Sequence, residues 1–305
     1  MLIDDIERYI TLRRSLGFSL ADTPRALAAF VHYAAAQGET HVRSATAISW
    51  ATQAPTQSSR HRRLQEVALF ARFLHAEDPA HEVPPQRLFY HASTRPAPYI
   101  YTHEELARLL NAAGNLRRQK PSPLRRHVYV MLFGLIAATG LRISEALNLK
   151  MSDLLPDGIL HIRETKFTKN RLVPLHPSVV EALNAYLLIR QRFAGISDHV
   201  FLSVGGAQLG YGTARAAFLV ILRKTGIGKG RLRPPRIHDL RHSFATHVLE
   251  QCGTQREDVA RDFVALSTYL GHSDIKYTYW YLEATPNLMM DISAAAEAFA
   301  AGEVV

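Results

Sequence analysis

Five prolines between positions 79 and 98 constrain the fold of this chain more than any other feature. Proline lacks the backbone N–H that a helix or a central strand needs, and it restricts the residue before it. The segment therefore predicts a boundary between two domains. We place an N-terminal domain at residues 1–90 and a linker at residues 91–101. A chain of 305 residues is long enough to bury two hydrophobic cores.

Upstream of the prolines, apolar residues recur at helical spacing and predict four helices within residues 2–76. Gly17 and Gly38 stand where the first and second helices should end, because glycine is common just beyond a helix C-terminus. The third and fourth helices are expected at residues 45–52 and 58–75.

Two basic segments are candidates for contact with DNA. The fourth helix begins with Arg60-His61-Arg62-Arg63, and residues 115–127 hold five cations and no acid. A solvated helix end and a mobile surface loop are the alternative interpretations. With one further lysine, the candidate DNA-binding residues are Arg60, Arg62, Arg63, Arg117, Arg118, Lys120 and Lys169.

Downstream of the prolines, Thr102 and Glu105 form a capping box that should open a helix. A mainly buried helix is expected from Leu124 to Thr139, with Gly140 ending it. Strands are expected at residues 159–162 and 172–175, in a β-hairpin or a small three-stranded sheet. Further helices are expected at residues 177–192, 213–225, 237–251, 257–269 and 274–282.

Charge and cysteine content bear on the partner and the compartment. The net charge is +9, of which residues 99–305 carry +7, and such a basic excess favours a polyanionic partner. Cys252 is the only cysteine, which fits a reducing cytosol. The longest apolar run, residues 128–138, is well short of the ~20 residues that span a bilayer. We therefore expect a cytoplasmic protein with no membrane association.

Three short motifs carry side chains suited to chemistry on phosphate. Arg142 lies in Ala-Thr-Gly-Leu-Arg-Ile-Ser-Glu, His238 and Arg241 lie in His-Asp-Leu-Arg-His, and His272 lies in Leu-Gly-His-Ser with Tyr281 nine residues on. His238 and Arg241 are three apart, hence on one face of a helix, and near its N-terminus, where the dipole favours a phosphate. Four such donors followed by a tyrosine suit attack on a phosphodiester without a metal.

A metal site and an ordinary ion pair are the competing interpretations of these motifs. His238, His242 and His247 could suggest ligands, but the chain has no H-E-x-x-H, no second cysteine and no carboxylate cluster. We therefore expect no metal. Glu145 is three residues from Arg142 and could form a simple i,i+3 pair, which is compatible with a role in orienting the guanidinium.

Over nearly its whole length the chain resembles the tyrosine recombinases, also called the phage integrase family, through these motifs. The resemblance implies a mainly α fold: an N-terminal four-helix core-binding domain, and an α+β catalytic domain with a small three-stranded antiparallel sheet. It places the catalytic domain at residues 102–287. Residues 288–305 form a tail that is either a helix exchanged between protomers or a frayed end. The segment between Arg241 and His272 is longer than in Xer-type or phage members and resembles transposon- and plasmid-borne ones.

The resemblance implies a tyrosine nucleophile and a lysine general acid. Tyr281 would attack a DNA phosphate and form a 3′-phosphotyrosyl link, while Tyr277 and Tyr279, close competitors, would pack against the domain. Lys166, counted back from an R-L-V-P-L strand, would protonate the leaving 5′-oxygen. Lys169 is its rival, because residues 165 and 167 lack the glycine that the family usually has beside this lysine.

The remaining site residues would surround the phosphate. The resemblance implies that Arg142 and Arg241 clamp the non-bridging oxygens, that His272 donates to the same oxygens, and that His238 accepts the tyrosine proton. Because the covalent link keeps the bond energy, no nucleotide cofactor is needed. The partners implied are double-stranded DNA and three further copies of the chain, in a homo-tetramer on paired DNA sites.

Site-specific recombination, in integration, excision or transposition of a mobile element, is therefore the expected function. A catalytically inactive DNA-binding accessory protein of the same fold is one alternative, although the full set of site residues argues against it. A type IB-like topoisomerase, which shares the chemistry, is another.

Overall fold

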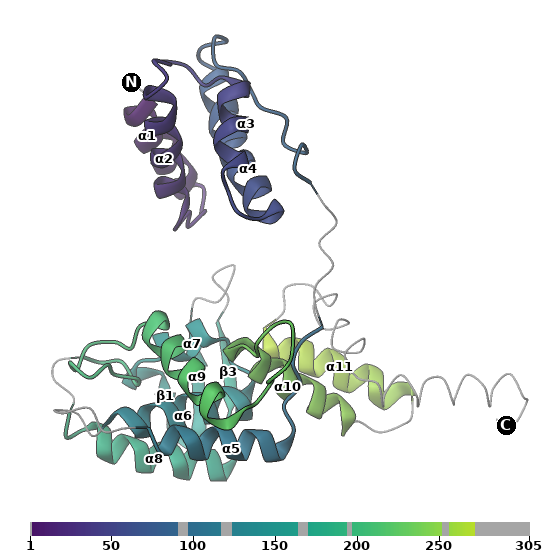
Figure 1. Cartoon of the computed structure of the whole chain (residues 1–305). Coiled ribbons are helices and arrows are strands. Elements are labelled where there is room, and N and C mark those ends of the chain that lie inside the picture. Colours follow the sequence, from purple (N-terminus) through teal and green to yellow (C-terminus); the bar gives the residue numbers. More distant parts are fainter. Residues whose placement is uncertain are drawn as a thin grey trace, which may run out of the picture. The chain divides into compact units, whose positions relative to one another are not determined.

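A computed structural model describes residues 2–90, 97–116, 124–163, 170–193, 197–251 and 256–271, with backbone alone for residues 256–260 (Figure 1). The chain divides into two compact units, Met1–Pro96 and Ala97–Val305. Each unit has its own hydrophobic core. Across the described helices, none combines the length and the apolarity that a bilayer crossing requires.

The first unit contains four helices, as predicted: α1 (Leu2–Ser15), α2 (Thr23–Ala35), α3 (Ser44–Thr52) and α4 (Gln57–His75). Gly17 and Gly38 lie just beyond α1 and α2 with φ of +87° and +74°, a region that favours glycine. The core of this unit is built from one face of each helix and includes the fully buried Leu27, Phe30 and Phe70. Burial of these faces stabilises helices that would be marginal in isolation.

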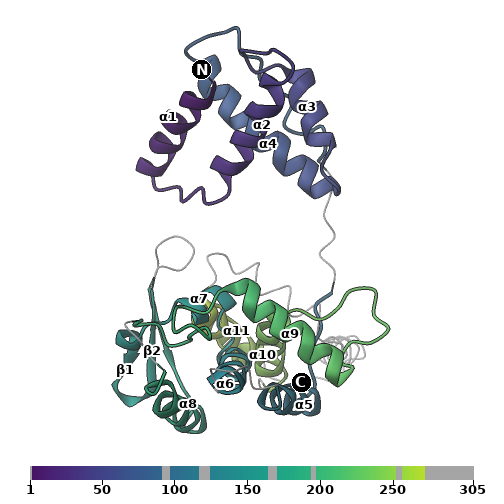
Figure 2. The same ribbon diagram turned by 60° about the vertical axis from the view of Figure 1, so that its left-hand side comes forward.

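The second unit is mainly helical (Figure 2). Its elements in chain order are α5 (His103–Gly114), α6 (Leu124–Thr139), α7 (Ile143–Asn148), η1 (Met151–Asp153), β1 (Leu154–Leu155), η2 (Pro156–Gly158), β2 (Ile159–Ile162), β3 (Arg171–Pro174), α8 (Pro177–Arg190), α9 (Tyr211–Thr225), α10 (Ile237–Glu250) and α11 (Arg256–Leu270). The capping box of α5 is confirmed, because Thr102 Oγ1 accepts from the Glu105 N–H and Glu105 accepts from the Thr102 N–H. The limits of α6 are those predicted.

The strands form one antiparallel sheet in the order β1-β2-β3. Leu160 pairs with Val173, and both are fully buried, so one face of the hairpin covers the core. The prediction of a small three-stranded antiparallel sheet is therefore confirmed. Residues 164–169, which contain Lys166 and Lys169, connect β2 to β3 and lie outside the described residues.

Helix α6 is the centre of the second unit, in contact with α5, α8 and α10. Residues on most of its circumference are buried, which agrees with the apolar run that predicted a buried helix. Tyr101 is also fully buried in this core, and its N–H donates to Ser243 Oγ of α10 at 2.8 Å. Residues 97–101, which the sequence assigned to the linker, thus pack with the second unit.

Candidate active site

The turn between α6 and α7 positions the first candidate arginine. Gly140 has φ +62°, and a Cβ there would lie 2.5 Å from the Phe244 ring of α10, so the close packing of this turn requires glycine. Arg142 then stands at the N-cap of α7. Glu145 accepts a hydrogen bond from the Arg142 N–H at 3.0 Å and one from Arg142 Nη1 at 2.6 Å. This local geometry accounts for the G-L-R-x-x-E spacing.

Glu145 also binds a second arginine, which the sequence analysis did not single out as a site residue. Arg171, the first residue of β3, donates from Nη2 to Glu145 Oε2 at 2.7 Å and from Nη1 to Oε1 at 3.0 Å. Burial alone raises the pKa of this carboxyl, but the hydrogen bonds and charge of Arg171, and then those of Arg142, lower it to about 2. Glu145 is thus an anion held between two guanidinium groups.

The end of α11 is bound by three arginines from other elements. Arg171 Nε donates to the Tyr269 carbonyl at 2.9 Å, and Arg241 Nη2 donates to the Leu270 carbonyl at 2.9 Å. Arg142 Nη2 donates to the Gly271 carbonyl at 3.1 Å. A helix C-terminus carries partial negative charge and unsatisfied carbonyls, so cations stabilise it. These contacts fix the position from which the chain continues into residue 272.

Arg241 is a fully buried cation on α10, with 1% of its surface exposed. Its Nη1 donates to the Gly140 carbonyl at 2.6 Å, in addition to the bond to Leu270. A buried charge is costly unless its donors are satisfied. The two carbonyls supply that compensation and join the α6–α7 turn to the end of α11.

His238 is the second residue of α10, as the prolines before it predicted. Its pKa is lowered to about 4, chiefly by desolvation and then by the charge of Arg241, against a smaller opposing effect of Asp239. The His238 side chain is exposed to solvent, so desolvation lowers its pKa less than it would for a fully buried ring. The charge of the nearby guanidinium groups also lowers this pKa. A neutral imidazole beside arginines can accept a proton at neutral pH.

The structure thus brings four predicted site residues into one region: Arg142, Glu145, His238 and Arg241 come from α7 and α10. Lys166, His272 and Tyr281 lie outside the described residues, as do Arg117, Arg118, Lys120 and Lys169 and the tail at 288–305. Arg142 and Glu145 line a polar cleft of about 640 Å³ together with His161 of β2 and Arg163, the residue after this strand.

Arg171 was not predicted as a site residue, because it served only as the start of the R-L-V-P-L strand from which Lys166 was counted back. One signal could have revealed it. It opens a strand whose side chains alternate between core and solvent, and a cation at a half-buried strand position needs an anionic partner.

The three basic residues at the start of α4 differ in their surroundings. Arg60 Nε donates to the Ala54 carbonyl at 2.9 Å. Arg63 lies over the Trp50 ring at 4.8 Å and donates to the Trp50 carbonyl. Both therefore have partners within the first unit, whereas Arg62 is exposed.

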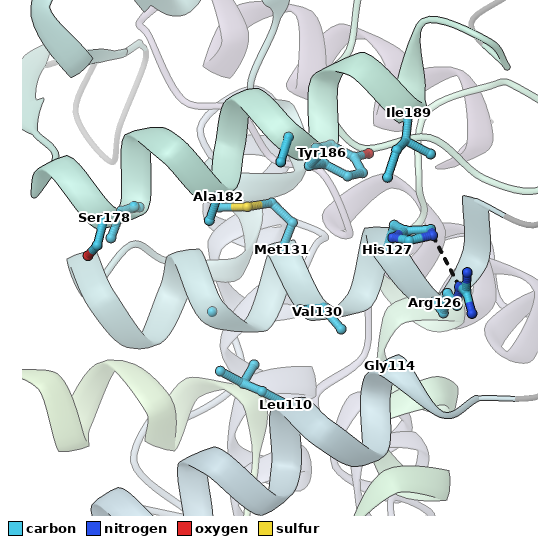
Figure 3. A pocket seen from close by; sticks show the side chains of 13 residues that line it. Leu110, Gly114, Arg126, His127, Val130, Met131, Ser178, Ala182, Tyr186 and Ile189 are labelled. Atoms are coloured by element: carbon cyan, nitrogen blue, oxygen red, sulfur yellow. Dashed lines mark hydrogen bonds between the residues drawn. The ribbon is translucent and has the colours of Figure 1, made fainter.

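A second cavity of the same unit is apolar and has a volume of about 550 Å³ (Figure 3). It lies among α5, α6 and α8, and residues such as Leu110, Met131 and Ile189 line it. Among the described residues, the titratable groups that line it are Arg126, His127 and Tyr186, and Arg126 bonds to His127 at 3.1 Å. Of the predicted site residues that the structure describes, none lines this cavity.

Within the described ranges, one group of side chains lies close enough together to hold a metal ion: His41, Asp78 and His81, in the first unit. The Val42 N–H donates to His81 Nδ1 at 3.1 Å, so the neutral ring carries its proton on Nε2. This ring cannot offer an Nε2 lone pair to an ion while that bond persists. We therefore assign the group a structural role, in which His41 bonds to Asp78 at 3.1 Å.

Comparison with known proteins identifies the family. A sequence profile of the phage integrase family matches residues 100–287. The chain is 38% identical over 294 residues to "Putative integrase/recombinase y4rB" of Sinorhizobium fredii (strain NBRC 101917 / NGR234), with 94% of each chain covered. It is 30% identical over 254 residues to tyrosine recombinase XerD of Brucella melitensis, which covers 81% of this chain and 78% of XerD.

Among solved structures, XerH site-specific recombinase bound to a palindromic difH substrate has the same fold. The TM-score is 0.67 at 19% identity, and the match covers 97% of this chain and 85% of that chain. The profile match and the two relatives, with the agreement in fold, lead to one conclusion. The chain belongs to the phage integrase family, the tyrosine recombinases, which are DNA strand-transfer enzymes.

Proposed function

We propose that this protein is a site-specific DNA recombinase that cleaves and rejoins duplex DNA through a 3′-phosphotyrosyl link at Tyr281. The observation that carries the proposal is that Arg142 and Arg241 both bind the end of α11, directly before His272, with His238 one helical turn from Arg241 on α10. Solved relatives bound to DNA, XerH and the Tn1549 transposon integrase among them, agree with a DNA substrate.

The chemistry follows from charge. Attack on a phosphodiester develops negative charge on the non-bridging oxygens, and preorganised cations stabilise that charge without reorganising. Arg142 is already oriented by Glu145, and Arg241 by two carbonyls. In the proposed reaction both guanidinium groups and His272 bind the phosphate oxygens.

Proton transfer completes the proposed reaction. The Tyr281 oxygen forms a bond to phosphorus, and the bond from phosphorus to the 5′-oxygen breaks. His238 takes the phenol proton, while Lys166, with Lys169 as its rival, gives a proton to the departing oxygen. The reverse steps with a second strand end restore the DNA and the free tyrosine.

The biological setting is part of the proposal. Two duplexes with two cleavage positions each need four active sites, so we propose a homo-tetramer on paired DNA sites in the cytoplasm. Residues 288–305 would join neighbouring protomers. The natural reaction would be integration, excision or transposition of a mobile element.

A nicked suicide substrate tests the proposal. A nick beside the cleavage site lets a short strand diffuse away, so the covalent complex accumulates. The full-length protein should form an adduct that survives denaturing electrophoresis, with and without EDTA. Absence of an adduct on DNA that the protein binds would favour an inactive accessory protein, and loss in EDTA would favour a metal nuclease. Relaxation of supercoiled DNA by a monomer, without strand exchange, would favour a topoisomerase.

A further inference from the structure

The loop between α9 and α10, residues 226–236, carries a concentration of charge that the active site does not use. Together with the last turn of α9, residues 223–236 contain six cations and no acidic residue. All six are exposed: Arg223, Lys224, Lys229, Arg231, Arg233 and Arg236. Figure 2 shows the loop as the green segment that stands out beyond the end of α9. Like charges this close repel one another, so binding of an anion would relieve the repulsion and be favourable.

The base of the loop is anchored to the unit. Ile227 is 4% exposed, and Pro235 is buried as well. A Cβ on Gly228, whose φ is +72°, would lie 2.4 Å from Pro235 Cδ, so the two ends of the loop pack directly against each other. The cationic tip therefore projects from a fixed base, and little conformational entropy of the base is lost when the tip binds a partner.

The base and the tip of the loop differ in how their charge is neutralised. At the base, Arg236 Nη2 bonds to Asp239 Oδ1 at 2.8 Å. At the tip, no carboxylate of the described residues lies within ion-pair distance of Lys229, Arg231 or Arg233. Arg231 instead stacks over the Tyr99 ring at 4.8 Å, a contact that orients the guanidinium and leaves its N–H edge for another acceptor.

The position of the loop in the chain indicates which anion it meets. Arg233 is five residues before His238, so the two Cα atoms are at most ~18 Å apart, given ~3.6 Å per extended residue. Phosphates of one DNA strand advance by about 3.4 Å along the duplex axis, so this reach corresponds to roughly five base pairs. If His238 lies beside the cleaved phosphate, Arg233 is within reach of the backbone of the same duplex.

We propose that Lys229, Arg231 and Arg233 bind phosphates of the substrate duplex, with Arg233 within about five base pairs of the cleavage site. The inference rests on the proposed function for the identity of the duplex. Contacts to phosphate position the protein without reading bases, so the loop contributes to affinity and register rather than to sequence choice.

The salt dependence of binding tests this directly. Each phosphate contact adds about 0.9 to the negative slope of log binding constant against log salt. The full-length variant Lys229→Ala/Arg231→Ala/Arg233→Ala should bind a fluorescent duplex of arbitrary sequence with a slope less steep by about 2 to 3. Its affinity at moderate salt should fall on the order of tenfold or more.

Two variants serve as matched controls. Leu232→Ala changes the tip of the same loop, where Leu232 is 98% exposed, without changing its charge. Arg192→Ala removes an exposed cation just after α8. Both should keep the wild-type slope. A triple variant that also keeps it would overturn the proposal, as would an equal loss of slope from Arg192→Ala.

The suicide substrate separates this inference from the proposed function. An adduct in the wild type, together with an unchanged slope in the triple variant, would overturn the loop assignment and leave the recombinase standing. A reduced slope in the triple variant without any wild-type adduct would support a DNA-binding loop in a protein that does not cleave. A wild type that binds no duplex at all would overturn both.

Discussion

Arg171 and Glu145, 26 positions apart in the sequence, form a bidentate ion pair. Arg171 Nη2 donates to Glu145 Oε2 at 2.7 Å, and Arg171 Nη1 donates to Glu145 Oε1 at 3.0 Å. The same carboxylate holds Arg142, and the same guanidinium holds the Tyr269 carbonyl. One ion pair therefore links the strand after the Lys166 segment, the first candidate arginine and the end of α11. The orientation of Arg142 depends on a residue that need not touch DNA.

We expect Arg171→Lys to slow adduct formation while leaving DNA binding nearly unchanged. Lysine keeps the charge but cannot bond to both carboxylate oxygens and a carbonyl in this fork geometry. Small displacements of a catalytic group can cost up to about 100-fold in rate, so a loss of roughly 10- to 100-fold is expected. Single-turnover rates at saturating DNA measure the effect separately from affinity.

The melting temperature of Arg171→Lys should be measured alongside the single-turnover rates. A merely structural defect would lower the melting temperature but would leave the cleavage rate of the folded protein unchanged. A wild-type rate at saturating DNA would contradict the positioning role.

Removal of either clamp arginine should slow cleavage strongly. Arg142→Ala or Arg241→Ala removes a donor to the developing charge, and such losses cost on the order of 100-fold or more. Arg241 is also buried and bonded to two carbonyls, so Arg241→Lys is a needed second variant that keeps a buried cation. Arg192→Ala is the control for general loss of charge, and near-normal cleavage by Arg142→Ala would count against the clamp.

Local sequence signals predicted most of the helices for identifiable reasons. The capping box at Thr102 and the glycine after Thr139 act over a few residues, so they can be predicted from the sequence without knowledge of the tertiary structure. The short helix α7 was not predicted, because six residues carry too little periodicity. Tyr101 looked like linker because proline-rich composition hid its burial against Ser243, a contact across 142 positions.

The candidate site divides in the same way. Arg142, His238 and Arg241 were found because each lies in a short motif, and Glu145 because it is one helical turn from Arg142. The role of Arg171 depends on a strand and a helix end that meet only in the folded unit, so no local spacing reports it. The exposed loop tip was missed because its charges are spread among glycines and prolines and resemble an ordinary surface turn.

Acid should weaken the native state through Glu145. Its pKa is about 2 in the folded protein, below the ordinary value of 4.5, so the unfolded chain binds the proton more readily. The ionised carboxylate therefore stabilises the fold fully above pH ~4.5, and this stabilisation is lost as the pH falls towards about 2. Denaturant titrations should show that Glu145→Gln is less stable than wild type at pH 7 and that the gap narrows in acid. A gap independent of pH would contradict this account.

His238 should remain active as a base well below the pH at which an ordinary histidine is protonated. Its lowered pKa of about 4 keeps the ring neutral from there upward, whereas an unperturbed ring is half protonated near 6.5. In the free enzyme, cleavage that depends on this base should therefore hold between pH 7 and 5 and decline nearer 4. Bound phosphate would raise the pKa, so the decisive profile is that of the free enzyme, taken from single-turnover rates at enzyme concentrations well below saturation of the DNA. A decline centred at 6.5 would show an ordinary histidine.

Replacement of the proposed nucleophile should separate binding from chemistry. Tyr281→Phe removes only the hydroxyl, so duplex binding should persist while the covalent adduct on the suicide substrate disappears. Tyr279→Phe and Tyr277→Phe are matched controls: on a helix Tyr279, two residues away, would not share a face with Tyr281, whereas Tyr277, four residues away, would share it and is the stricter control. Both controls should form the adduct. A gel-stable adduct from Tyr281→Phe, or its loss in either control alone, would move the nucleophile to another residue.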